Sequence, residues 1–526
     1  MGIYLNPDNK NFLEAVKDEE YVDKTMMIPV IERFMDSRNK YICMSRPRRF
    51  GKTIAGNMLS AYFSRGCDSR ELFSSFKVAR EYEGFGEKLN KCNVIKIDMN
   101  SEYQNTLDKS ELFEMLTNEI KYELREEFPD VEIPDKFSLA QSLLKIYSRK
   151  KQTFIIIIDE YDVLVREQAD SALFNEYLSF LNGLFKSDTL KSAISLAYLT
   201  GILPVVRDKI QSKLNNFREY TILDAGPFTE FVGFTEGEVK ELCGKYGMNF
   251  EDCARWYDGY RQNGFEIYNP ESVIVSMEKG RYGNYWGKTS SYEAISDRIR
   301  LNFEGTKEAV IRLLSGNTVK IDVDMYLNTM TDFKSRDEVL TYLIHLGYLA
   351  YTEEDQACWI PNKEIRLEWF RAISDLSDYS TTDKIIRDSE SLLQKTIDGD
   401  ETAVSEALDA SHINVSSNRS YNNEDVLQSA IYLSYIYALN KYTVVKEMTA
   451  GKGFADLTYI PYRTDSPAMI VELKRNSSVN SAINQIRKKE YFKSLEKYRG
   501  NLLFIGINYD EDTKKHSCKI ERFLKQ

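Results

Sequence analysis

A basic, glycine-bearing run between a predicted strand and a predicted helix is the first group of residues that could do chemistry. It reads Arg48-Arg49-Phe50-Gly51-Lys52-Thr53. Helix N-termini attract phosphate through free N–H groups and the helix dipole. A lysine there reaches the β- and γ-phosphates, and a threonine hydroxyl holds Mg²⁺. The run therefore predicts an ATP-binding loop in which Thr53 is a metal ligand. Arg46 stands where the generic pattern has its first glycine, so the run alone could also be a basic turn.

Polar residues at the ends of two later strands support the nucleotide reading. Four isoleucines at 155–158 lead into Asp159 and Glu160, and the next apolar run ends at Thr200. We expect Asp159 to bind Mg²⁺, Glu160 to activate the attacking water, and Thr200 to contact the γ-phosphate. Acids at strand ends are individually common as helix caps. Three such features in the correct order predict nucleotide binding and hydrolysis.

A second group of acids lies near the C-terminus. Asp456 follows a glycine-rich turn, and Glu472 and Lys474 alternate along the next predicted strand. Period-two spacing puts Glu472 and Lys474 on one strand face. If the Asp456 strand pairs alongside, Asp456 and Glu472 can ligate Mg²⁺ while Lys474 positions or deprotonates a water. That chemistry is metal-assisted phosphodiester hydrolysis.

Accessory residues flank this second group. Glu424 begins one predicted helix, and Gln485 and Lys488 lie on another that follows directly. The structural alternative is strong, because Glu-x-Lys on a strand is ordinarily a solvated face with a cross-strand ion pair.

The apolar pattern around the first group predicts the elements that position it. Strands at 40–45, 93–97, 153–158 and 193–200, with a short fifth at 222–223, alternate with helices at 53–63, 108–127 and 136–150. Such alternation predicts a parallel α/β sheet. Thr235 with Glu238 three positions on predicts a capped helix start after the sheet ends.

Three domains follow from these patterns: an ATPase domain at 1–228, a middle region at 229–410 and a nuclease-like domain at 411–526. The first is a P-loop parallel sheet. The middle is helical and winged-helix-like, with a helix and hairpin within 335–360. The last is α/β, with helices at 424–439 and 481–498. Residues 411–423 form a polar linker.

The motifs together resemble a bacterial and archaeal family with an N-terminal AAA-ATPase-like domain and a C-terminal PD-(D/E)xK nuclease-like domain. The resemblance covers most of the chain and explains Arg46, since the family's own loop reads Arg-Pro-Arg-Arg-Phe-Gly-Lys. The segments that carry it on the ATPase side include Tyr21-Val22-Asp23-Lys24-Thr25, Asp159-Glu160-Tyr161-Asp162, Leu199-Thr200-Gly201, Leu214-Asn215-Asn216, Trp256-Tyr257-Asp258-Gly259-Tyr260 and Tyr285-Trp286.

On the nuclease side the resemblance is carried by Glu424, Gly453-Phe454-Ala455-Asp456, Glu472-Leu473-Lys474 and Gln485-Ile486. One position departs from the pattern: Phe454 stands where relatives often carry arginine. The resemblance implies an ASCE/AAA-like fold for the first domain and a restriction-endonuclease-like α/β fold for the last. It also implies ATP hydrolysis and nuclease activity, and it names no pathway.

The amino-acid composition excludes several classes of protein. The 526 residues are 42% hydrophobic and 29% charged, which excludes disordered and collagenous chains. Seven cysteines without a Cys-x-x-Cys pair, and an N-terminus without an apolar core, favour a reducing cytoplasm and no signal peptide. No apolar stretch is long enough to span a bilayer, so we expect no membrane partner.

The net charge of −11 hides an uneven distribution. Residues 420–526 hold 17 Lys and Arg against 12 Asp and Glu, hence +5, and the preceding residues carry −16. The basic part contains Arg487-Lys488-Lys489, as contact with a nucleic-acid backbone would need. Both DNA and RNA remain open as partners, and so does a homo-oligomer.

The leading hypothesis is an enzyme in which the nucleotide state of the ATPase controls a Mg²⁺-dependent nuclease. The alternative is an ATP-dependent binding switch or scaffold whose nuclease-like domain is catalytically silent.

Overall fold

The computed structural model describes residues 2–526 except for thirteen short segments. The residues outside it are 168, 205–215, 289–291, 315, 325, 327–332, 375–379, 416–423, 451–452, 462–465, 492–494, 496–500 and 524–526. The side chains of 374, 380–387, 412–415, 424–426, 429, 433, 440 and 449–450 are also not described. Leu214, Asn215, most of the predicted linker and the side chain of Glu424 therefore lie outside the described residues.

The chain divides into two compact units, which are taken separately here. Unit 1 comprises residues 1–291 and 318–366, and unit 2 comprises residues 292–317 and 367–526. The sequence predicts three domains with other boundaries, and those boundaries remain a prediction.

Unit 1 is built on a five-stranded parallel sheet in the order β2-β3-β4-β1-β5. Its strands are β1 (Tyr41–Ser45), β2 (Asn93–Asp98), β3 (Phe154–Asp159), β4 (Ile194–Gly201) and β5 (Arg218–Tyr220). β1, β3 and β4 are buried along their whole length, as strands covered on both faces must be. The predicted parallel sheet is thus confirmed. The fifth strand is displaced from the predicted 222–223 to 218–220.

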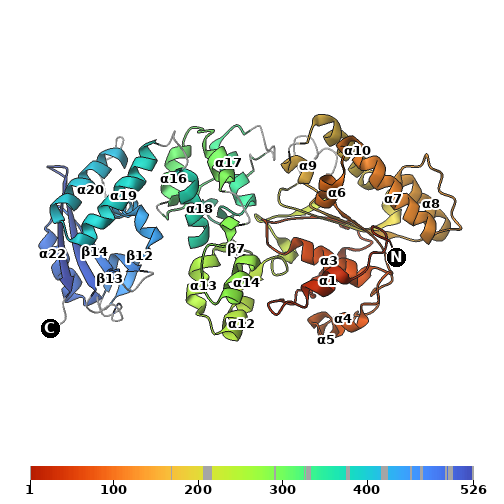
Figure 1. Ribbon diagram of the computed structural model, residues 1–526, viewed down its shortest axis with the longest axis horizontal. Helices are drawn as coiled ribbons and strands as arrows, with labels where there is room; N and C mark the ends of the chain where they lie inside the picture. Colours follow the sequence, from red (N-terminus) through yellow and green to blue (C-terminus); the bar gives the residue numbers. More distant parts are fainter. Residues whose placement is uncertain are drawn as a thin grey trace. The chain divides into compact units, whose positions relative to one another are not determined.

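Helices cover both faces of this sheet (Figure 1). One face carries α1 (Lys10–Ala15) and α3 (Lys52–Phe63), and the other carries α7 (Leu112–Glu127), α8 (Leu139–Lys150) and α10 (Ser171–Phe185). Apolar residues of α7, α8 and α10 form one buried cluster with β1, β2, β3 and β4. The remaining helices around the sheet are short: α2 (Met27–Phe34), α4 (Arg70–Ser74), α5 (Lys77–Glu81), α6 (Met99–Asn105), η1 (Lys109–Glu111), α9 (Val163–Arg166), η2 (Leu190–Ala193) and η3 (Gly226–Phe228).

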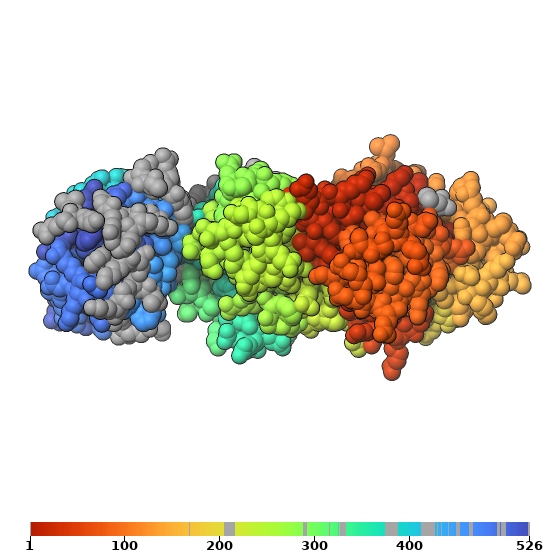
Figure 2. Space-filling view, turned by 90° about the horizontal axis from the view of Figure 1, so that it is seen from below, coloured from red at the N-terminus to blue at the C-terminus, as the bar shows by residue number. Residues whose placement is uncertain are grey.

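A smaller region completes unit 1. It contains α12 (Glu236–Tyr246), α13 (Phe250–Tyr257), α14 (Pro270–Lys279), η4 (Trp286–Lys288) and a small sheet of β6 (Phe234–Thr235), β8 (Phe265–Tyr268) and β7 (Tyr260–Gln262). The predicted cap of α12 is confirmed, since Thr235 and Glu238 form a capping box. Figure 2 shows atoms of this region, in yellow-green, beside the red N-terminal residues of the same unit. The Tyr246 hydroxyl donates to Glu20 at 2.6 Å between them.

A helix followed by a hairpin closes unit 1, as the sequence predicts. α17 (Arg336–His345) precedes the antiparallel strands β10 (Ala350–Thr352) and β11 (Ala357–Trp359), and β9 (Val319–Lys320) adds a third strand. α17 is buried from Glu338 to His345, so most of it serves as core in this unit.

Unit 2 contains a five-stranded mixed sheet in the order β12-β13-β14-β15-β16. Its strands are β12 (Tyr442–Ala450), β13 (Gly453–Pro461), β14 (Ala468–Arg475), β15 (Leu502–Asp510) and β16 (Lys515–Phe523). Only the β14–β15 pair is parallel. The helices of unit 2 are α15 (Glu293–Ile299), α16 (Thr306–Leu314), α18 (Lys363–Ser374, which begins in unit 1), α19 (Ser380–Asp398), α20 (Glu401–Val415), α21 (Glu424–Ser434), η6 (Ile436–Asn440) and α22 (Val479–Lys488).

Two predicted helices of unit 2 are shorter than expected. α22 ends at Lys488 rather than at 498, and α21 stops at Ser434 before the single turn η6. α22 packs on the sheet through Ile483 and Ile486, which join one apolar cluster with Ala455 and Ile470. In the part of the chain that the structure describes, no helix is long and apolar enough to cross a membrane.

Candidate nucleotide and metal sites

The phosphate-loop candidate lies between β1 and α3, as predicted. α3 begins at Lys52, and Gly51 caps it in a left-handed conformation with φ of +84°. A residue with a Cβ is strained there, which explains the glycine. Arg48, Arg49 and Thr53 are exposed around this helix start. The loop therefore presents a helix N-terminus flanked by basic residues, a suitable site for an anion.

Arg46 is a structural part of the loop. Its side chain is 1% exposed, and its guanidinium donates to the carbonyls of Ser45 at 2.8 Å and Tyr220 at 3.1 Å. Burial lowers the pKa of Arg46 to about 10. Arg46 thus ties the start of the loop to β5, a function that a glycine at this position could not perform.

Lys52 is buried beneath the loop. Its ammonium donates to the carbonyls of Arg46 at 2.9 Å and Pro47 at 2.8 Å. Burial lowers the pKa of Lys52 to about 8, against the opposing effect of Asp159, Asp162 and Glu160. The ammonium is therefore held close to the loop and to the acids at the edge of the sheet.

The predicted acids and threonine meet at the carboxyl edge of the sheet. β4 lies between β1 and β3, so Thr200 is next to Asp159, and its hydroxyl donates to the Asp159 carboxylate. Asp159 is 3% exposed. Glu160 follows with a φ of +51°, which turns the chain sharply at this point. Lys52, Asp159, Glu160 and Thr200 are thus brought together.

Arg166 is a neighbour that the sequence analysis missed. Its guanidinium lies 2.5 Å from the Glu160 carboxylate and 3.4 Å from that of Asp162. Asp162 in turn accepts hydrogen bonds from the backbone N–H groups of Ile202 and Leu203, just after Thr200. Arg166 therefore positions Glu160. The available signal was its spacing of four residues from Asp162 on a helix.

An apolar pocket adjoins the start of α3. Lining side chains come from the N-terminal segment, from α3 and from the smaller region, and they include Tyr21, Val22, Ile54, Met58, Phe231 and Ile274. Gly51 and Phe50 of the loop also line it. A flat apolar group attached to a phosphate at this helix start could enter the pocket. Sequence reasoning did not identify it, because three distant segments build it.

The loop is held by the smaller region as well. The Phe50 carbonyl accepts from the Gly233 N–H at 3.0 Å, and its ring meets that of Tyr260 edge-on at 5.5 Å. Arg49 lies 3.3 Å from the Glu271 carboxylate. The Tyr260 hydroxyl donates to the Gly347 carbonyl at 2.6 Å. A rearrangement of the loop would therefore shift or break its contacts with the smaller region.

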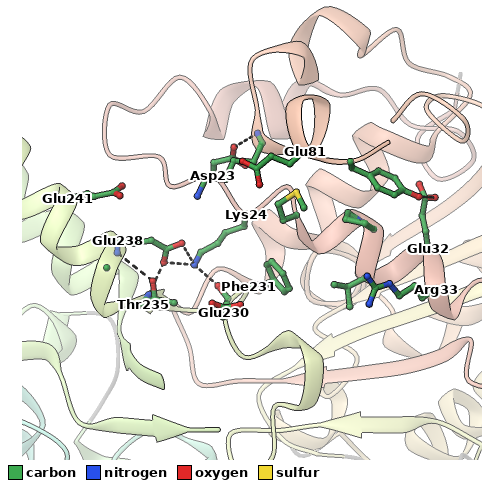
Figure 3. Close-up of a pocket in the computed structure, with 16 residues that line it drawn as sticks. Asp23, Lys24, Glu32, Arg33, Glu81, Glu230, Phe231, Thr235, Glu238 and Glu241 are labelled. Atoms are coloured by element: carbon green, nitrogen blue, oxygen red, sulfur yellow. Dashed lines mark hydrogen bonds and ion pairs between the residues drawn. The ribbon is translucent and has the colours of Figure 1, made fainter. Parts of the chain in front are cut away.

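A larger hollow of about 810 Å³ lies beside this pocket and shares Lys24 and Phe231 with it. Lys24 points across it to Glu238, while Glu32 and Arg33 lie at its other end (Figure 3). The Lys24 ammonium donates to both oxygens of Glu238, at 2.6 and 2.7 Å, and to the Glu230 carbonyl at 2.6 Å. Glu238 also accepts from the Thr235 N–H. This clamp joins the segment that precedes the loop to the start of α12.

The second candidate site lies where β13 and β14 pair. The Leu473 N–H donates to the Asp456 carboxylate at 2.7 Å, which brings that side chain next to Glu472. Glu472 is 1% exposed, and the Lys474 ammonium lies 2.9 Å from its carboxylate. The three predicted residues are thus brought together. The two carboxylates supply the oxygen ligands that hard divalent cations favour, and the lysine ammonium can contact a phosphate.

Helices on either side approach this group. On α21, the Gln428 side chain donates to the Asp456 carbonyl at 3.0 Å. Gln485 of α22 donates to the Tyr491 hydroxyl at 3.4 Å. Burial raises the pKa of Tyr491, and the Glu472 and Asp456 carboxylates add to the shift.

The accessory predictions differ in outcome. Gln485 contacts Tyr491, whose pKa the two carboxylates raise, whereas Lys488 is exposed at the end of α22 and makes no described contact with the carboxylates. Gln428 was missed, although it lies one helical turn beyond Glu424. Among the described side chains, no three His, Cys, Asp or Glu residues cluster as a metal site.

Comparisons with known proteins give the following matches. Residues 10–211 match the family model of a predicted AAA-ATPase, and residues 422–518 match that of the PD-(D/E)XK nuclease superfamily. An uncharacterised protein of Azotobacter chroococcum, from the vnfD 5′ region, is 22% identical over 292 residues. That alignment covers 54% of this chain and 53% of the relative, so the chain matches about half of that protein's length.

Two solved structures show low similarity. The Aeropyrum pernix ORC2 protein, in ADPNP and ADP complexes, is 10% identical with a TM-score of 0.32, covering 68% of this chain and 96% of its own. The ORC1 protein of the same organism, in complex with DNA, is 12% identical with a TM-score of 0.28, covering 68% and 93%. The two family models match separate parts of the chain, so the N-terminal region is similar to the predicted AAA-ATPase family and the C-terminal region is similar to the PD-(D/E)XK nuclease superfamily.

Proposed function

We propose that this protein binds and hydrolyses ATP at the β1–α3 loop and that its nucleotide state controls Mg²⁺-dependent cleavage of nucleic acid in unit 2. The observation that carries the proposal is that each predicted set of residues meets at one place. Lys52, Asp159 and Thr200 meet at one sheet edge, and Asp456, Glu472 and Lys474 meet at another.

At the first site the phosphates would lie on the N-terminus of α3, with Lys52 turned from the loop carbonyls towards them. Arg48, Arg49 and Phe50 belong to the same loop, and the base would enter the adjoining apolar pocket. Thr53 and Asp159 would hold Mg²⁺, which neutralises phosphate charge when bound. Glu160, positioned by Arg166, orients and activates the attacking water, and Thr200 contacts the γ-phosphate.

At the second site Asp456 and Glu472 would hold Mg²⁺, with Glu424 as an accessory acid. The bound metal would lower the pKa of a water and stabilise charge on the phosphate. Lys474 would position a water or help to deprotonate it, while Gln485 and Tyr491 would enclose the site. Lys488 contacts the nucleic-acid backbone. The donor types fit a hard cation, since the side chains that meet are carboxylates without sulfur ligands.

One observation favours a second candidate function. Lys474 already forms an ion pair with Glu472, which is the arrangement that a catalytically silent sheet would keep. In that case ATP would alter a binding surface and no phosphodiester would be broken.

A cleavage assay separates the two. Purified full-length protein is incubated with single- and double-stranded DNA and RNA, with and without ATP and Mg²⁺. We expect Mg²⁺-dependent cleavage that Glu472→Ala abolishes, and ATP hydrolysis that Lys52→Ala abolishes. Asp512→Ala and Lys10→Ala, at exposed positions, should keep both activities. Cleavage undiminished in Glu472→Ala would refute the nuclease assignment, and nucleotide-dependent binding without cleavage would establish the switch.

A further inference from the structure

A lysine lies on the same face of the parallel sheet as the proposed Mg²⁺ ligand of unit 1. Lys96 is on β2, the edge strand, and its register partner on β3 is Ile157. The next pair on the same side of both strands is Asp98 and Asp159. Two residues of strand separate the two pairs by about 7 Å. A Cβ on Gly56 would lie 3.7 Å from the Ile157 side chain, so α3 covers this face.

α3 contacts Lys96 through Asn57. The Lys96 ammonium donates to the side-chain oxygen of Asn57. α3 starts at the phosphate loop and runs back along the sheet, and Asn57 comes one helical turn, about 6 Å, after Thr53. This step along α3 matches the step along the strands. The Thr53 hydroxyl and the Asp159 carboxylate, oxygen donors that suit Mg²⁺, thus form one level of the site, and the hydrogen bond of Lys96 forms the level below it.

The charge of Lys96 acts on the acids at the edge of the sheet. Burial lowers the pKa of Lys96, and the charges of Asp159 and then Asp98 oppose that shift. The Asp98 carboxylate already caps α6, because it accepts from the N–H groups of Asn100 and Ser101. Asp159 is therefore the better placed of the two carboxylates to hold a metal ion, and Lys96 supplies a positive charge behind it.

A hollow of about 450 Å³ lies beside β2 and is lined by Lys96, Asn57 and Asp98 together with residues of the N-terminal segment and of α6. Water in this hollow screens the field of Lys96 at the metal site without removing it. The hollow also has room for a change of side chain at this position, so a neutral residue of similar length leaves no closed cavity.

We propose that Lys96 is a positioning residue of the nucleotide site, which ties α3 to β2 below Thr53 and weakens the attraction of Asp159 for Mg²⁺, so that metal and nucleotide are released after hydrolysis. The inference rests on the proposed ATP site and names the residue that sets the affinity of that site for Mg²⁺. A lysine with a structural role alone would act in the opposite direction, because losing its contact with α3 would displace Thr53 and weaken metal binding.

Removal of the charge with retention of the hydrogen bond tests this sign. The full-length protein and its Lys96→Gln variant are given a fluorescent, non-hydrolysable ATP analogue, and Mg²⁺ is titrated in. The signal comes from the nucleotide, so Mg²⁺ at the second site does not contribute. A unit charge about 7 Å from a divalent ion in a partly solvated site changes the affinity for that ion about 5- to 50-fold. We expect Lys96→Gln to lower the Mg²⁺ dissociation constant by that factor.

Three further variants complete the test. Lys96→Arg keeps the charge and should keep the Mg²⁺ dissociation constant within about twofold. Asn57→Asp places a carboxylate against the Lys96 ammonium and should tighten Mg²⁺ binding as Lys96→Gln does, so the test does not depend on the folding of one variant. Lys91→Gln, at an exposed position just before β2, should change nothing. A Mg²⁺ dissociation constant that rises or stays the same in Lys96→Gln and Asn57→Asp would overturn the proposal.

The outcomes distinguish this inference from the proposed function. If the unmodified protein binds the analogue with Mg²⁺ while Lys96→Gln holds the metal no more tightly, the ATP site stands and the inference fails. If the unmodified protein binds no nucleotide, the proposed ATP site fails and the inference fails with it.

Discussion

The protonation state of Lys52 can be tested by a simple binding measurement. Burial lowers its pKa to about 8 in the free protein. Phosphate oxygens would favour the ammonium, so ATP binding above that pH must take up a proton. The affinity for ATP should therefore be constant below the pKa that Lys52 has in the free protein, and it should fall as the pH rises through that pKa.

We predict that the ATP dissociation constant increases by up to about tenfold per pH unit above pH 8. Titration calorimetry between pH 7 and pH 9 measures the slope. Lys52→Arg is the matched control, because arginine stays protonated over this range and its slope should be flat even where its affinity is lower. The same slope in both proteins would show that Lys52 does not carry the dependence.

Residue types and spacing predicted which side chains meet, but not how each is held. Lys52, Asp159 and Thr200 follow from a parallel sheet, since the ends of neighbouring strands share one edge. Tyr491 was expected close to the second site, since it follows the Gln485 helix in the sequence. The spacing of Arg166 from Asp162 was available as a signal, but its contact with Glu160 depends on the sharp turn of the chain at that residue.

At the scale of elements, the N-terminus of α12 is the place where the segment before the phosphate loop is attached to the smaller region. Glu238 completes the capping box and also receives Lys24, so one carboxylate holds both the helix start and the segment before the loop. The two side chains are 14% and 17% exposed. Removing the cation would leave that carboxylate poorly solvated and without its partner.

Lys24→Met should therefore destabilise unit 1 by about 2–4 kcal/mol, which is near the cost of breaking a buried pair from one side. The first transition in thermal unfolding measures the effect. Adding Glu238→Gln should recover part of the loss, because the uncompensated charge is then absent. Lys10→Met, in an exposed pair, should shift the transition by less than about 0.5 kcal/mol. An unchanged transition in Lys24→Met would contradict the clamp.

Elements with long apolar runs were predicted closely, and short or marginal ones were not. β3 follows from its isoleucines, because a strand buried on both faces must be apolar throughout. β5 was misplaced by a few residues because an edge strand of three residues carries no such run. α22 was predicted too long, since residues after Lys488 continue a helix-compatible pattern without a stop signal. The pocket beside α3 could not be predicted, because three separate segments line it.

At the scale of the whole molecule, the charge distribution agrees with the proposal that the C-terminal region binds nucleic acid and the N-terminal region binds ATP. The residues up to 419 carry −16 and residues 420–526 carry +5, so the negative total is compatible with a polyanionic partner for the C-terminal region. The two family matches fall on these same two parts of the chain. We propose above all that the nucleotide state of the N-terminal part controls strand cleavage by the C-terminal part.

The most direct test of that claim is the rate of Mg²⁺-dependent strand cleavage by the full-length chain without nucleotide, with ATP and with a non-hydrolysable ATP analogue. We predict that nucleotide changes the rate at least about fivefold, the lower end of usual coupling between sites. Lys52→Ala should remove that response while keeping the nucleotide-free rate, and Glu472→Ala should remove cleavage in every state. A cleavage rate that is the same in all three nucleotide states, or a full response in Lys52→Ala, would contradict the account.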